Sequence, residues 1–170
     1  MNSEFRIQNS EFAVVALGSN LGDSAQIMNA AFARLVAFAV APPRCSSLWR
    51  SAPVDCPPGS PGFLNAVAVF TPLPQLTPES LLAELQALEK EFGRQPKKVL
   101  NEARPLDLDL IAFGREMRGT PALTLPHPRA HLRRFVLEPL CELAPSYVLP
   151  GQTRTVAELL AALTATGAAA

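Results

Sequence analysis

An excess of charge of one sign, paired cysteines and long apolar runs are all lacking in this chain of 170 residues. Its 15 basic and 15 acidic residues leave no formal net charge, whereas general nucleic-acid binders usually carry a basic excess. No apolar run reaches the roughly 18 to 20 residues that a membrane span needs. We therefore expect neither nucleic acid nor a membrane as a partner.

Cysteine pairs are lacking too, because the three cysteines, Cys45, Cys56 and Cys141, are odd in number and widely spaced. Without a C-x-x-C pair, neither a zinc site nor a disulfide framework is expected, and a reducing, cytoplasmic compartment fits best. What the chain does contain, 48% hydrophobic and 18% charged residues, is typical of a globular protein. Its length predicts one domain with a substantial core.

The N-terminus contains a short repeat, because Asn-Ser-Glu-Phe at 2–5 recurs at 9–12. A Glu-Phe pair is what a common cloning site encodes. We therefore expect residues 1–12 to be a cloning-derived or disordered segment outside the fold. A single domain is expected over 13–170.

Hydrophobic periodicity and turn residues predict interleaved strands and helices. The expected strands cover 13–17, 46–51, 63–70 and 106–113. The expected helices cover about 24–39, 78–92, 130–140 and 155–163. Thr77 and Thr155 are predicted N-caps. The proline-rich segment 52–62 and the polar segment 94–104 are expected to be loops, and an irregular link follows Gly114. This order predicts an α+β sandwich, with a sheet of about four strands covered by helices.

Two aspartates alternate with leucines within 104–110. On a strand, side chains two residues apart share a face, so Asp107 and Asp109 lie on one face and the leucines on the other. Adjacent carboxylates repel each other unless a cation lies between them, and Mg²⁺ prefers such oxygen ligands. The segment by itself leaves a magnesium site and a solvated strand face equally open.

Basic residues flank this acidic pair along the chain. They are Arg94, Lys97, Lys98 and Arg104 before it, and His127, Arg133 and Arg134 after it. Acids for a metal and cations for phosphates are the groups that phosphoryl transfer requires. Each arginine taken alone is more typical of an exposed surface.

Two further patches carry weaker signals. Phe63 and Asn65 share a strand face, and a ring beside an amide can hold a flat heterocycle, although a lone phenylalanine is more often a core residue. The turn Gly18-Ser19-Asn20 has neither a Walker pattern nor a dinucleotide fingerprint, so by itself it is only a turn.

Taken in order, these motifs resemble the 6-hydroxymethyl-7,8-dihydropterin pyrophosphokinases over about residues 13–150. The specific element is R-x-x-D-x-D at 104–109 with Leu-Pro-His-Pro at 125–128. The other matching segments are 16–22, 50–53, 63–66, Glu89 with Gly93-Arg94, and Arg133 with Phe135. The resemblance implies a ferredoxin-like α+β fold with a mainly antiparallel sheet, acting as a monomer or weak oligomer in folate biosynthesis.

The resemblance also implies a reaction. The substrate hydroxymethyl oxygen would attack the β-phosphorus of ATP, and AMP would leave. Two Mg²⁺ ions would be held by Asp107 and Asp109. The residues implied to be catalytic are Arg94, Arg104, Asp107, Asp109 and His127. Loops 52–62 and 94–104 would close over the substrates.

Binding roles follow from the same resemblance. The pterin would be sandwiched by Phe63 and Phe135, and its polar edge would be read by Ser51, the backbone near Val54 and Asn65. The residues implied to contact ATP are Gln86, Glu89, Arg94, Arg104, Leu110 (by its backbone), Thr124, His127 and Arg133.

The chain departs from the family pattern at several positions. A Trp-Gly-Pro that often precedes Arg104 is here Asn-Glu-Ala at 101–103, and a second arginine is here Pro96. An aromatic after the histidine is Pro128, and a basic residue is Ala122. These changes affect phosphate contacts and loop closure. We hypothesise that Lys97 or Lys98 supplies the missing cation.

Two other functions remain open at this point. One is a different magnesium-dependent phosphotransferase or nucleotide hydrolase that uses the same acidic pair. The other is a non-catalytic binding domain of the same fold, which has no need to keep paired like charges.

Overall fold

The computed structural model describes residues 12–96, 98–99 and 101–166. Its central strand β1 (Ala13–Ser19) lies between β4 (Phe63–Phe70) and β5 (Asp107–Phe113) and is antiparallel to both. Two short strands, β2 (Arg44–Cys45) and β3 (Trp49–Ser51), pair with opposite ends of β4. The result is a five-stranded antiparallel sheet, close to the expected four.

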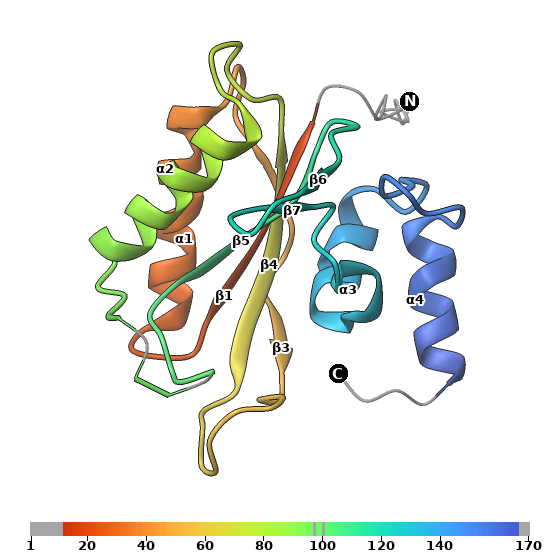
Figure 1. Ribbon diagram of the computed structural model, residues 1–170. Helices are drawn as coiled ribbons and strands as arrows, with labels where there is room; N and C mark the ends of the chain where they lie inside the picture. The colour runs from red at the N-terminus through yellow and green to blue at the C-terminus, as the bar shows by residue number, and fades with distance from the viewer. Residues whose placement is uncertain (1–11, 97, 100, 167–170) are drawn as a thin grey trace, which may run out of the picture.

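Helices cover both faces of this sheet (Figure 1). On one face lie α1 (Ser24–Leu35) and α2 (Pro78–Glu91); on the other lie α3 (Arg134–Leu143) and α4 (Val156–Ala165). The predicted ferredoxin-like α+β sandwich is therefore confirmed. Within the described ranges, no helix is both long and apolar enough to cross a membrane.

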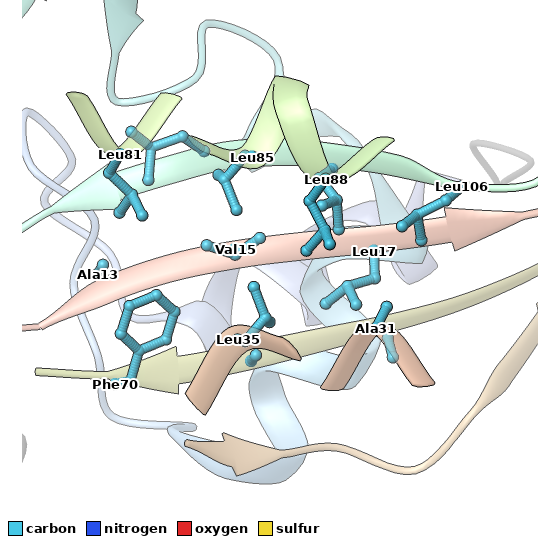
Figure 2. Close-up of a cluster of buried hydrophobic side chains, with 14 of the residues drawn as sticks. Ala13, Val15, Leu17, Ala31, Leu35, Phe70, Leu81, Leu85, Leu88 and Leu106 are labelled. Atoms are coloured by element: carbon cyan, nitrogen blue, oxygen red, sulfur yellow. The ribbon is translucent and has the colours of Figure 1, made fainter. Parts of the chain in front are cut away.

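The central strand is buried on both faces because its alternate residues enter two cores. Ala13, Val15 and Leu17 pack against α1 and α2, as Figure 2 shows for that cluster. Val14 and Ala16 belong to the second core, with residues of α3 and α4. This explains why β1 is a continuous apolar run rather than an alternating one.

The predicted helix starts are confirmed by their caps. The Thr77 hydroxyl accepts a 3.1 Å hydrogen bond from the Ser80 amide, and the Thr155 hydroxyl accepts one of 3.2 Å from the Glu158 amide. Both form capping boxes, which satisfy amides that the first turn leaves unpaired. Gly93, just beyond α2, has φ +90°, a conformation that glycine adopts without steric cost.

Two predicted elements are interrupted in the structure. The helix expected over 24–39 ends at Leu35 and continues only as the 3₁₀ turn η1 (Val36–Phe38). The reason is pairing with a later segment: the Val40 amide donates to the carbonyl of Thr71. Of the strand expected over 46–51, only β3 forms, and β2 lies just before the expected range; between them, the buried Ser46 hydroxyl accepts a 3.0 Å hydrogen bond from the Val67 amide.

Two other segments differ from expectation. The helix expected over 130–140 is a 3₁₀ turn, η2 (Ala130–Leu132), followed by α3. The link after Gly114, expected to be irregular, contains the short hairpin β6 (Arg118–Gly119) and β7 (Thr124–Leu125). Two-residue strands are too short to show a periodic pattern in the sequence.

The start of the fold lies close to the predicted boundary. Phe12 packs against the second core, and its carbonyl accepts a 2.8 Å hydrogen bond from the Gly114 amide. The rest of the segment predicted to be cloning-derived, residues 1–11, lies outside the described residues.

Candidate active site

The sheet face opposite Leu108 and Leu110 carries both aspartates of β5. The two leucines are 4% and 3% exposed and belong to the core under α2, whereas Asp107 and Asp109 are half-buried. Burial raises the pKa of Asp109, and the neighbouring charge of Asp107 raises it further. The two carboxylates therefore lie close enough to repel each other, as the strand period predicts.

Asp107 is held by two arginines from the preceding loop. Arg94 Nη1 donates to one carboxylate oxygen at 2.8 Å, and Arg104 Nη2 donates to the other at 2.7 Å. All three side chains are only about one-fifth exposed, with fractions of 19%, 17% and 20%. Solvent therefore screens these charge-assisted bonds less than it screens surface pairs.

Glu89 connects α2 to this group. It is 6% exposed, its Oε1 accepts a 2.7 Å hydrogen bond from the Leu108 amide, and it forms an ion pair with Arg94. Burial raises the pKa of Glu89, while the Leu108 amide and Arg94 lower it. Glu89 thus anchors Arg94 to the backbone between the two aspartates.

His127 lies beside Asp109. The His127 amide donates to the Ile111 carbonyl at 2.8 Å, which holds the turn against β5. The Arg129 amide donates to His127 Nδ1 at 3.2 Å, so the neutral ring carries its proton on Nε2. Burial lowers the pKa of His127, although the charge of Asp109 opposes that shift. Arg133 also lies near Asp109, with its Nη1 3.7 Å from a carboxylate oxygen.

These side chains surround a hollow of about 320 Å³. Its lining consists of Leu82, Gln86, Glu89, Arg94, Asn101, Arg104, Asp107, Leu108, Asp109, His127, Arg129, Arg133 and Phe135. No group of three or more metal-ligating side chains occurs among the residues that the structure describes. A divalent cation here would therefore use the two aspartates and complete its shell with other oxygens, a donor set that Mg²⁺ accepts from carboxylates and phosphates.

A second hollow of about 250 Å³ adjoins the first. Its lining includes the predicted pterin residues Ser51, Val54, Phe63 and Phe135. Asn65, only 5% exposed, donates from Nδ2 to the Ser51 hydroxyl at 2.8 Å, so both polar groups are held in place. This pocket combines aromatic walls with fixed polar groups, which suits a flat heterocycle.

The two hollows share part of their lining: Asn101, Arg104, Arg129, Arg133 and Phe135. The guanidinium of Arg104 lies 5.5 Å from the centre of the Phe63 ring, and that of Arg133 lies 5.3 Å from the Phe135 ring. Both arginines can therefore contact a group at the junction.

The turn at Gly18-Ser19-Asn20 connects these parts. A Cβ on Gly18 would lie within 4 Å of Phe63, Asn65 and Asp107, which shows that all three side chains converge there. Asn20, 4% exposed, accepts a 2.9 Å hydrogen bond from the Arg104 amide and donates to the Pro61 carbonyl at 3.3 Å. A turn that was uninformative in the sequence thus connects loops 52–62 and 94–104 to β1.

A few predicted positions lie elsewhere. Leu110 is buried in the core and Thr124 is exposed on β7, and neither lines the two hollows. Lys98 lines a third hollow of about 220 Å³, which shares Arg94 and Arg104 with the first, and Lys97 lies outside the described residues. Arg129 lines both hollows but was not predicted, because a single arginine after a proline turn carries no distinctive signal.

Relatives of known name were found by sequence and by structure. Residues 14–145 match the profile described as 7,8-dihydro-6-hydroxymethylpterin-pyrophosphokinase (HPPK). The chain is 40% identical over 156 residues to the 2-amino-4-hydroxy-6-hydroxymethyldihydropteridine pyrophosphokinase of Pseudomonas aeruginosa, covering 87% of this chain and 89% of that protein. For the enzyme of the same name from Synechocystis sp., the identity is 38% over 149 residues, with 87% and 74% covered.

A solved structure, the wild-type Plasmodium falciparum HPPK-DHPS with SDX-DHP, superposes with a TM-score of 0.72 at 13% identity. The match covers 92% of this chain and 45% of that one, so the chain spans less than half of that longer protein. At this identity the superposition supports the fold alone. From the profile and the sequence relatives, we conclude that the chain belongs to the 7,8-dihydro-6-hydroxymethylpterin-pyrophosphokinase family.

Proposed function

We infer that this chain transfers a diphosphate group from ATP to 6-hydroxymethyl-7,8-dihydropterin, a step of folate biosynthesis. AMP and the pterin diphosphate are the products. The observation that carries this assignment is the pair of adjoining hollows, one with acids and cations for phosphates and one with aromatic walls. Family membership supports the same reaction.

The step is a substitution at phosphorus. The hydroxymethyl oxygen forms a bond to the β-phosphorus, the bond from that phosphorus to the bridging oxygen of AMP breaks, and the hydroxyl proton passes to solvent. Phosphoryl transfer of this kind depends mainly on positioning and on neutralising charge. Residues that hold the two substrates in adjoining hollows supply that positioning.

The cations of the first hollow are suited to the phosphate chain. Arg94 and Arg104 present guanidinium groups that can form paired hydrogen bonds to phosphate oxygens. His127, with its proton on Nε2, is a neutral donor to the same chain. We assign Gln86 and Glu89 to the nucleotide side, because both line the first hollow and not the second.

Asp107 and Asp109 are the residues that would hold magnesium, and we propose two ions, as the resemblance implies. When bound, Mg²⁺ supplies charge neutralisation of the phosphates. In the second hollow, Phe63 and Phe135 would stack on the pterin while Ser51 and Asn65 bind its polar edge. Both hollows are lined by one chain, so we expect the monomer to be competent.

The nucleotide product tests this assignment directly. The protein is mixed with magnesium, ATP and 6-hydroxymethyl-7,8-dihydropterin, and the nucleotides are separated. AMP formed in step with a pterin diphosphate supports diphosphate transfer. Formation of ADP would indicate another phosphotransferase, and a folded protein without pterin-dependent turnover would indicate a non-catalytic domain.

A further inference from the structure

Arg129 lies where the two hollows meet. It precedes η2 and is one of the five residues that line both hollows. Its side chain is exposed, and with the described residues its guanidinium forms no hydrogen bond or ion pair. By contrast, Arg94, Arg104 and Arg133 each have a carboxylate partner.

The surroundings of this arginine are cationic. Arg104 and Arg133, the other two charged residues that line both hollows, are cations as well. The five residues that line both hollows thus include three arginines and no acid, so the junction is electrostatically suited to a polyanion.

The backbone of Arg129 is held firmly even though its side chain is exposed. Its amide donates to His127 Nδ1 at 3.2 Å, and the next residue, Ala130, is 1% exposed and donates to the His127 carbonyl at 3.0 Å. His127 is itself bonded to β5. The fixed backbone keeps the guanidinium within reach of the junction, where Arg129 lines both hollows.

The group that belongs to both hollows is the one that is transferred. Leu82, Gln86 and Glu89 line only the first hollow, and Ser51 and Phe63 line only the second. Resting on the function proposed above, we propose that Arg129 binds the transferred diphosphate and therefore the pterin diphosphate product, rather than AMP.

The test compares Arg129→Ala and Arg129→Lys with Arg154→Ala, a control at an exposed arginine outside both hollows. Affinities for pterin diphosphate and for AMP are measured by calorimetry on each folded variant. Loss of one charge-assisted contact weakens binding by roughly tenfold or more. We expect Arg129→Ala to weaken pterin diphosphate binding by that factor and AMP binding less than about twofold. Arg129→Lys should recover part of the loss.

Equal weakening of both ligands, or no weakening of either, would overturn the proposal. Thermal unfolding checks that the variants are folded. We expect them to fold because the Arg129 side chain is exposed. Failure of the proposed function is distinguishable, because the unmodified protein would then neither form AMP nor bind pterin diphosphate.

Discussion

Arg94 donates a 2.8 Å hydrogen bond to Asp107, so a side chain assigned to the phosphates holds one assigned to the metal. Arg104 holds the other oxygen of the same carboxylate at 2.7 Å. A magnesium ion must compete with both guanidinium groups for these oxygens. Phosphates relieve that competition, because they are alternative acceptors for the same arginines.

Magnesium binding should therefore depend on the nucleotide. We expect Mg²⁺ alone to bind weakly, and a non-hydrolysable ATP analogue to raise its affinity by roughly tenfold or more. Calorimetric titration of Mg²⁺ with and without the analogue measures the difference. By linkage, Mg²⁺ must raise the affinity for the analogue by the same factor. Equal Mg²⁺ affinity in both titrations would contradict this exchange of partners.

Asp109→Asn should lower activity without lowering stability, whereas Asp107→Asn should lower both. Asp109→Asn removes a carboxylate whose pKa is raised by burial, so we expect activity to fall by roughly a hundredfold or more with no loss of stability. Asp107→Asn should cost similar activity and also about 1 to 3 kcal/mol of unfolding free energy, because Arg94 and Arg104 lose a charged partner.

Steady-state kinetics and urea unfolding of both variants measure these effects. The two substitutions are matched in size and in charge change, so each is the control for the other. A normal rate in either variant would exclude a metal-binding role for that aspartate.

Asn101 connects the two loops that border the site. Its Nδ2 donates to the Asp55 carbonyl at 2.8 Å, and both residues have positive φ, 54° and 51°. Asn101→Gly keeps that backbone conformation available and removes the hydrogen bond. We expect the KM for the pterin to rise about three- to tenfold, with kcat less affected, as the loss of one hydrogen bond implies.

Asn101→Ala is the comparison, since it removes the same bond and also strains the backbone. It should be at least as impaired as the glycine variant and less stable. If both variants keep the original KM, the link between the loops does not contribute to pterin binding.

Tyr147 predicts an alkaline limit to stability. Burial raises its pKa from 10.0 to about 12, so the neutral phenol is favoured in the folded chain. The contribution of this neutral, buried phenol to the free energy of unfolding is complete below about pH 10. It is lost as the pH rises towards 12, because the tyrosine of the unfolded chain ionises first. The loss should total about 2 to 3 kcal/mol.

Tyr147 is the single tyrosine, so its phenolate absorbance reports this ionisation directly. Urea unfolding between pH 8 and 11 should show a steeper decline than in Tyr147→Phe, which removes the titrating group while preserving the ring. An ordinary tyrosine titration midpoint in the folded chain would show that burial has no such effect.

Local patterns in the sequence predicted much of the fold. The continuous apolar run of β1, the caps at Thr77 and Thr155, and the alternation around Asp107 are readable because each depends on neighbouring residues. The predictions failed where distant segments intervene. Examples are the end of α1, where Val40 bonds to Thr71, and the break at Ser46, whose hydroxyl bonds to Val67.

The candidate site likewise has features that the local sequence predicts and features that depend on the folded chain. The shared face of Asp107 and Asp109 follows from the strand period alone, whatever the rest of the chain does. Three relationships depend instead on residues far apart in the chain: Glu89 with Leu108, Asn20 with Arg104, and Asn65 with Ser51. No local pattern encodes such pairs, because they exist only after the sheet has formed.

Arginines show this division most clearly. From the sequence, each arginine taken alone is more typical of an exposed charge than of a phosphate ligand, and the side chain is long enough for either role. Tertiary packing decided that Arg94 and Arg104 bond to Asp107 and that Arg129 lines two hollows without an ion-pair partner among the described residues. The physical reason is that charge interactions depend on distance and burial, which the order of residues specifies only through the folded chain.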